Sequence, residues 1–293
     1  MLSNIDSQDM RIVRLRNKAK LEIGETNEDL IPERIQELKE LIKEEGGDKF
    51  HMHPSRYDDF YLKCLRARKY DVDRAAKLYK KYCNLRTNTL HMVPKLLPSC
   101  HAHLYHDKLC SILKFRDNRG RHVFIVRVEK WDAKETTFDD FLSTLFLLLD
   151  EIIISIDTQL HGVTVIGDLK GLGLSHVRLV SPNTLRTAAG VLQDSYPARF
   201  KEFHAINNPF VFNMIWALGK PFLKDKIRKR MYFHGGDFAS LHRSLSIDAK
   251  LLPDFLGGSV PEKEYADLNI INSLLKKDDH FKDFFKYGYT ART

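Results

Sequence analysis

The chain has 293 residues, of which 43% are apolar and 29% are charged, a balance typical of a folded protein and not of a disordered chain. Lys and Arg outnumber Asp and Glu by 47 to 39, which favours an anionic partner, either nucleic acid or an acidic lipid surface. Residues 1–10 lack the apolar core of a secretory signal, so we expect a cytoplasmic protein with no export step.

The N-terminal segment, from Arg11 to about Val93, carries apolar residues at helical spacing and is predicted to contain helices only. Its first clear helix should end at Gly46-Gly47. Two further amphipathic stretches begin near Asp58 and Asp73. We therefore expect a small all-helical domain over residues 1–95.

The character changes after this segment, where Ser111–Phe115 and Val123–Val128 alternate around a turn at Asp117–Gly120 and predict a β-hairpin. Strands alternating with helices then argue for an α/β domain over residues 96–262. The predicted elements are a helix over Phe138–Ile156, a strand at Val163–Ile166, a helix at Thr184–Leu192, a strand at Phe203–Ile206, a helix over Phe210–Arg230 and a strand at Met231–Phe233.

Two segments contain enough apolar residues to be considered for membrane contact, one as a possible membrane span and the other as a possible surface contact. The run Phe138–Ile156 includes Asp139, Asp140, Asp150 and Glu151, and each charge at a bilayer centre costs roughly 2.5 to 3.5 kcal/mol, so this helix should be buried or face a ligand. The tail over residues 263–293 is predicted to be a short helix that packs back on the body, with surface contact to a membrane as the alternative.

Signatures of catalysis and of metal binding are weak. The four cysteines, Cys64, Cys83, Cys100 and Cys110, are expected to be free thiols. The stretch 100–110 adds three histidines, but its spacing matches no standard zinc module, so we expect no metal. No nucleotide-binding or hydrolase motif occurs, and Gly167–Leu174 lacks the spacing of a phosphate loop. We expect no enzyme and no cofactor, since the nominal catalytic candidates Asp168, His176 and His204 suit structural hydrogen bonds better.

A basic segment follows an apolar stripe near the end of the α/β region. Phe212, Ile215 and Leu218 share one helical face, a pattern that usually means core packing. Lys220–Arg230 then carries six cations against one Asp, and Arg199 with Lys201 forms a second basic pair. A solvated helix face is the plain interpretation of such charge. If both groups converge, they could hold a multiply charged phosphate, whereas nucleic acid would require exposed stacking aromatics that are not interleaved here.

Several short motifs occur in a defined order along the chain. They are Asp58-Asp59-Phe60, Leu65-Arg66-Ala67-Arg68-Lys69-Tyr70, Ala75-Ala76-Lys77-Leu78, Asp168 with Gly171, Leu192–Phe200, His204 with Ile206-Asn207, Lys220-Pro221-Phe222-Leu223 and His234-Gly235. Together they resemble the CRAL-TRIO family from about Asp58 to Pro261. The resemblance implies a lipid-binding α/β domain with a mixed sheet, whose pocket is closed by a mobile lid helix at about Asn208–Leu218.

The resemblance also implies site residues. Phosphoinositide-binding cations are carried over onto Arg199, Lys201, Lys226 and Arg230, all of which are basic here. The implied ligand pocket is apolar and comprises Leu142, Leu145, Leu149, Val163, Gly167, Val180, Ala188, Val191, Leu192, Phe203, Phe212, Ile215 and Leu218.

The implied pocket differs from those of other family members at the positions that set ligand specificity. The polar groups that the family's tocopherol and retinaldehyde carriers place beside their ligands have no counterpart at Leu145, Leu149, Gly167 or Thr187. We therefore expect a carrier of one hydrophobic lipid, a terpenoid such as tocopherol, a retinoid or a carotenoid, that docks peripherally on endosomal or other membranes containing phosphatidylinositol bisphosphate. The alternative is a phosphoinositide-binding protein for phospholipid exchange or trafficking.

Overall fold

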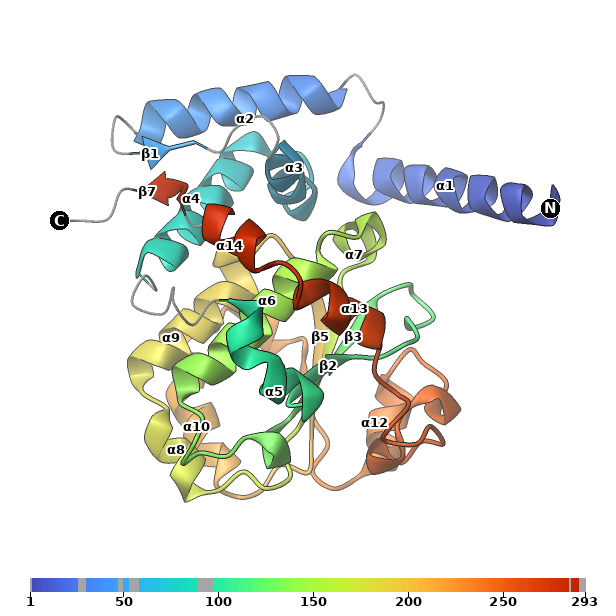
Figure 1. Cartoon of the computed structure of the whole chain (residues 1–293), viewed down its shortest axis with the longest axis vertical. Coiled ribbons are helices and arrows are strands. Elements are labelled where there is room, and N and C mark those ends of the chain that lie inside the picture. Colours follow the sequence, from blue (N-terminus) through green and yellow to red (C-terminus); the bar gives the residue numbers. More distant parts are fainter. Residues whose placement is uncertain are drawn as a thin grey trace.

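The computed structural model describes residues 2–25, 30–46, 50–52, 58–88, 97–284 and 286–289. The N-terminal region contains the helices α1 (Leu2–Ile23), α2 (Leu30–Gly46), α3 (Asp58–Ala67) and α4 (Val72–Asn88) (Figure 1). Helix α2 ends at Gly46 as predicted, and Gly47 lies outside the described residues.

The expectation of helices only is wrong in one detail of this region. The two-residue strand β1 (Phe50–His51) pairs antiparallel with β7 (Gly288–Tyr289) from the C-terminal tail. A strand this short carries no periodicity of its own, and it forms because a distant segment supplies its hydrogen-bonding partner.

An aromatic cluster holds the helical region together. Tyr61 and Tyr79 are fully buried, and the ring of Phe60 lies 4.7 Å from that of Tyr82. Arg66, at the end of α3, donates to Glu25 at 2.8 Å, just beyond α1. Burial of large rings and a shielded ion pair therefore join helices that the amphipathic pattern could identify but could not place.

A mixed sheet of five strands in the order β2-β3-β4-β5-β6 lies at the centre of the described structure. Strands β2 and β3 form the predicted antiparallel hairpin, and the later pairings are parallel. This confirms the predicted α/β class. The strands are β2 (Cys110–Ile112), β3 (His122–Arg127), β4 (Val163–Asp168), β5 (Phe200–Ile206) and β6 (Met231–Phe233).

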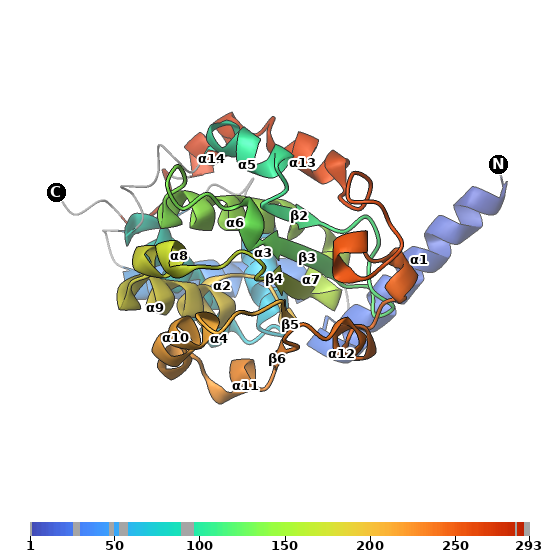
Figure 2. The same ribbon diagram turned by 90° about the horizontal axis from the view of Figure 1, so that it is seen from below.

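The two faces of this sheet are covered differently (Figure 2). One face lies against α12 (Phe238–Ser244) and the segment that follows it, and there Ile125, Ile166 and Ile206 are fully buried. The other helices of this region are α5 (Ala102–His106), α6 (Phe138–Ile152), α7 (Ile156–His161), α8 (Leu174–Leu179), α9 (Pro182–Gly190), α10 (Phe212–Gly219) and α11 (Asp225–Arg228). Of these, α6, α8, α9 and α10 lie on the opposite side of the sheet from α12.

Two long predicted helices are shorter than expected. The predicted helix over Phe138–Ile156 ends at Ile152, and a separate helix α7 begins at Ile156. The predicted helix over Phe210–Arg230 is divided into α10, a 3-10 turn at Lys220–Phe222 and α11. Gly219 and Pro221 explain the second break, because proline has no amide hydrogen to continue the helix.

The predicted packing of the tail on the body is confirmed. Helices α13 (Leu268–Leu274) and α14 (Asp278–Phe284) bury Ile271, Leu274 and Phe281, and Lys277 binds Glu151 of α6 at 2.6 Å. Phe284 reaches the aromatic cluster of the helical region, 5.3 Å from Phe60. No helix within the described ranges combines the length and apolar character needed to cross a bilayer.

Two buried histidines are kept neutral by their surroundings. Burial and the nearby Arg116 lower the pKa of His122 to about 3. Burial and the adjacent His234 lower the pKa of His204 to about 4. His204 Nδ1 lies 3.1 Å from His234 Nε2, and His122 Nδ1 lies 3.1 Å from the Thr158 hydroxyl, so both rings are held in hydrogen-bonded networks.

This burial makes folding sensitive to acid. Both folded pKa values lie below the ordinary value of about 6.5, so the unfolded chain takes up protons first as the pH falls. We expect the free energy of unfolding to drop between pH 7 and pH 5 by roughly 2 kcal/mol for each histidine. Urea unfolding at both pH values should show a smaller drop in His122→Gln than in the wild type, and equal drops would contradict the assignment.

Candidate functional site

The sheet face opposite α12 keeps accessible surface in the interior of the protein. Val126, Val165, Gly167 and Ala205 occupy neighbouring positions on strands β3, β4 and β5, and each remains partly exposed. Their strand neighbours on the other face are fully buried. Because these residues lie in the middle of a covered sheet, the difference indicates unfilled space above this face.

Two of the helices over that face, α6 and α9, start from well-defined caps. Thr137 and Asp140 form a capping box at the start of α6. Ser181 accepts from the Thr184 amide at the start of α9, and Pro182 follows at the first helical position. Sequence-local signals therefore fix where these helices begin, and their apolar faces then fix how they lie on the sheet.

The implied pocket residues occupy these helices and strands. Leu142, Leu149, Val163, Val191 and Phe203 are buried in one apolar cluster, and Leu145 and Leu192 pack against it. Phe212 and Ile215 of α10 pack against a neighbouring cluster that contains Trp131. Val180 follows α8, Ala188 lies on α9, and Leu218 is 47% exposed on the outside of α10.

Helix α10 is the least buried of the covering helices. None of its residues is buried, although Trp216 and Phe212 contact the Phe233 ring at 4.8 and 5.4 Å. Its outer side exposes Met214 and Leu218, and Phe210 before it is 87% exposed. An apolar helix with so little burial has few contacts to lose if it moves away from the sheet.

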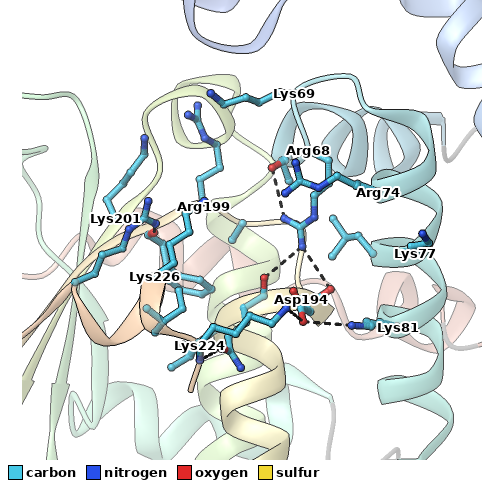
Figure 3. A pocket seen from close by; sticks show the side chains of 18 residues that line it. Arg68, Lys69, Arg74, Lys77, Lys81, Asp194, Arg199, Lys201, Lys224 and Lys226 are labelled. Carbon is cyan, nitrogen blue, oxygen red and sulfur yellow. Dashed lines mark hydrogen bonds and ion pairs between the residues drawn. The ribbon is translucent and has the colours of Figure 1, made fainter. Parts of the chain in front are cut away.

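A basic pocket lies beside the covered space, between the helical region and the α/β region (Figure 3). It has a volume of about 690 Å³. Of its described lining residues, one is acidic, Asp194, and ten are basic: Arg68, Lys69, Arg74, Lys77, Lys81, Arg199, Lys201, Lys224, Lys226 and Arg230. Such an excess of cations around one cavity favours a multiply charged anion.

Asp194 organises one side of this basic pocket. Its carboxylate binds Lys224 at 2.6 Å and Lys81 at 3.2 Å, and these bonds outweigh the effect of burial and lower its pKa. Gln193 beside it accepts from the Lys224 amide at 2.5 Å and donates to the Phe222 carbonyl at 3.0 Å. These contacts attach the segment after α10 to the π-helical turn Val191–Ser195.

The other side of the basic pocket is short of counter-charge. Burial and the neighbouring Arg199 lower the pKa of Lys201 to about 8. Burial and the nearby Arg230 likewise lower the pKa of Lys226. Arg199 binds Glu22 of α1 at 3.3 Å, and Arg230 donates to the Phe200 carbonyl. The pocket therefore holds several cations that repel one another before any ligand binds.

All four cations carried over from the family resemblance line this pocket: Arg199, Lys201, Lys226 and Arg230. Sequence reasoning missed the contribution of the helical region, which supplies Arg68 and Lys69 from the turn after α3 and three cations from α4 (Figure 3). The spacing of the three α4 cations was the available signal, since Arg74, Lys77 and Lys81 recur on one helical face.

The nominal catalytic residues occupy structural positions. Asp168 accepts from the Lys170 amide and from Asn207, as expected for a residue that ends a strand. His176 lies 2.9 Å from the Trp131 carbonyl, and His204 stacks on His234. The four cysteines are free thiols, as predicted. Within the described residues, no group of three His, Cys, Asp or Glu side chains is placed to hold a metal ion.

Comparison with known proteins identifies the family. The CRAL/TRIO domain model matches residues 106–258. The chain belongs to this family. It is 33% identical to human alpha-tocopherol transfer protein-like over 250 residues, which cover 85% of this chain and 71% of that protein. It is 34% identical to clavesin-1 of Xenopus laevis over 248 residues, 83% of this chain and 72% of that protein. The name of the first of these relatives refers to the transfer of alpha-tocopherol.

A solved structure supports the fold independently. The crystal structure of Sfh5 superposes with a TM-score of 0.51 and covers 87% of this CRAL/TRIO chain and 98% of its own, at 16% identity. At that identity the likeness concerns the fold, namely the mixed sheet with its helical N-terminal region, and it confirms the predicted architecture.

The crowding of cations should reduce the stability of the empty protein. Because the folded state lowers the pKa of Lys201, a charged amine at this position opposes folding at neutral pH. We expect Lys201→Met to raise the free energy of unfolding by about 1 kcal/mol at low salt, with a smaller gain at high salt. Lys77→Met, at an exposed position of the same pocket, is the control and should change little. Destabilisation by Lys201→Met would show that the amine makes favourable contacts instead.

Proposed function

We propose that this protein is a carrier of one hydrophobic lipid, a terpenoid such as tocopherol, a retinoid or a carotenoid, and not an enzyme. The observation that carries the proposal is the apolar sheet face whose residues stay partly exposed beneath a helix that has no buried residue. The bound lipid is its ligand, with no separate cofactor. The proposed location is cytoplasmic, peripheral on endosomal or other membranes that contain phosphatidylinositol bisphosphate.

The lining of the covered space supports a ligand with few polar groups. The side chains facing it from α6 and the sheet include Leu145, Val126 and Val165, and the buried hydroxyls of Ser143 and Thr144 are bonded within α6. Each buried CH₂ is worth about 0.8 kcal/mol, so a ligand with a dozen or so carbons could bind tightly without a hydrogen bond. A phospholipid would require polar partners for its head group in the same space.

The basic pocket supports docking on a phosphoinositide. Its cations come from both regions of the protein, and Lys224, Lys226 and Arg230 follow directly after α10. A polyphosphorylated head group would relieve their mutual repulsion while bringing the exposed apolar side of α10 to the bilayer surface. Opening of this lid helix would then release the lipid into the membrane.

The identity of the carried lipid tests the proposal directly. The protein purified from its native source should yield a terpenoid by solvent extraction, mass spectrometry and absorption spectroscopy. Recovery of phosphatidylinositol or phosphatidylcholine alone would reject the terpenoid assignment and favour phospholipid exchange or trafficking.

Loss of pocket cations should separate docking from lipid binding. We expect Lys226→Ala with Arg230→Ala to weaken binding to vesicles containing phosphatidylinositol bisphosphate roughly 30-fold, because each cation near an anionic surface contributes about 1 kcal/mol. Transfer of lipid to those vesicles should slow, while lipid affinity in solution stays unchanged. Arg243→Ala with Lys250→Ala removes two exposed cations near α12 and is the matched control. Equal loss of docking and lipid affinity would indicate a structural role for Lys226 and Arg230.

Filling the covered space should have the opposite effect. A side chain at Gly167 would meet only ordinary contacts, with Leu169 at 3.7 Å and the His204 carbonyl at 3.9 Å from an added Cβ. We therefore expect Gly167→Ile to fold, to dock on vesicles normally and to bind lipid at least roughly tenfold more weakly, since overpacking costs about 1 to 3 kcal/mol. Fluorescence titration with a terpenoid measures the affinity. Unchanged affinity would place the ligand elsewhere.

A further inference from the structure

Helix α1 is attached to the protein along one side. Ala19 and Ile23 are buried, and Arg11 binds Asp157 of α7 at 2.5 Å. At its C-terminal end Glu22 reaches Arg199 on the rim of the basic pocket. The N-terminal half of the helix extends beyond the rest of the protein in both views (Figures 1 and 2). The C-terminal end of α1 therefore lies beside the basic pocket, and its N-terminal half points away from the protein.

The outer side of α1 carries an apolar stripe. At 100° per residue, Met10, Val13 and Leu21 lie on the side of the helix opposite the buried Ala19. They are 57%, 55% and 85% exposed. Isolated exposed apolar residues are common, but these three share one unpartnered helix face, on which Asn17 lies between Val13 and Leu21.

Cations flank this stripe. Arg14 and Lys20 lie at the two edges of the stripe, and residues 10–21 contain no Asp or Glu. Within the described residues, Arg14 and Lys20 form no ion pair. A second copy of the chain would bring like charges together across this face, so charge complementarity favours an anionic partner over self-association.

We propose that the outer face of α1, formed by Met10, Val13, Leu21, Arg14 and Lys20, is a second membrane contact that lies on anionic bilayers. An apolar stripe bordered by cations is the arrangement with which interfacial helices enter the head-group region. Unlike the basic pocket, which is concave and suits one multiply charged head group, this convex face interacts with the average surface charge. It therefore responds to phosphatidylserine without any phosphoinositide.

Vesicle sedimentation with the full chain tests this contact. The vesicles are phosphatidylcholine alone or phosphatidylcholine with phosphatidylserine, both free of phosphoinositide. Arg14→Gln with Lys20→Gln should weaken binding to the anionic vesicles roughly 30-fold, about 2 kcal/mol. Val13→Gln with Leu21→Gln should weaken it roughly tenfold or more without changing the net charge. Leu268→Gln replaces a leucine of 54% exposure on α13 and should have no effect.

The two proposed contacts are separable. Lys226→Ala with Arg230→Ala should keep most binding to phosphatidylserine vesicles, whereas the α1 variants should retain lipid affinity and binding of the soluble inositol phosphate head group. Retention of wild-type binding to phosphatidylserine by both α1 variants overturns the inference. So does a change from dimer to monomer on light scattering, which would assign the face to a second copy. Circular dichroism confirms that each variant keeps its helix content.

A probe on the helix reports insertion directly. In a Cys100→Ser background, which removes the exposed cysteine, Leu21→Cys carries an environment-sensitive dye. Its emission should shift to the blue on phosphatidylserine vesicles and remain unchanged on phosphatidylcholine vesicles. The same dye at Leu268→Cys should not shift on either. No shift at position 21 on the anionic vesicles contradicts insertion.

Discussion

The unequal packing of the two sheet faces is the constraint on which the rest of this protein depends. One face is filled by the isoleucines of β3, β4 and β5 against α12 and needs no ligand to be stable. The other keeps accessible surface at Val165, Gly167 and Ala205, and its cover includes a helix without a buried residue. Stability is thereby concentrated on one side of the sheet, and the cover of the other side has fewer contacts to lose if it moves.

Ten cations of the protein gather in the basic pocket. The basic pocket lies where α3 and α4 meet the segment after α10, so a short stretch of chain joins its residues Lys224 and Lys226 to α10. Burial and the neighbouring Arg199 lower the pKa of Lys201, so a charged amine at this position opposes folding of the empty protein. A cost of this kind is expected where selection favours function over stability, in agreement with the proposed anion-binding role of the pocket.

Much of the fold could be predicted from periodicity and turn chemistry. The hairpin at Asp117–Gly120, the parallel strands and the starts of α3 and α6 have local signals, and the structure has them where the sequence indicates. The failures have local causes as well, because Pro221 breaks a helix that apolar spacing alone would continue. The pairing of β1 with β7 had no local signal, since two residues are too few to show alternation.

The candidate site was predictable only in part. Arg199 and Lys201 stood out as a basic pair, and the family resemblance supplied Lys226 and Arg230 as their partners. The contribution of α3 and α4 depends on how two regions of the protein meet, and helical periodicity cannot give the relative placement of distant elements. Composition likewise could not predict that one face of the sheet keeps accessible surface, because the same valines could line a filled core.

The contact of the C-terminal tail with the helical region affects the order in which the protein can be completed during synthesis. The Phe284 ring packs on Phe60 and Tyr82, and β7 supplies the partner of β1. During synthesis, α3 and α4 therefore emerge from the ribosome long before the residues that complete their core have been made. Until then the aromatic cluster stays partly open, and the nascent chain presents apolar surface that chaperones recognise.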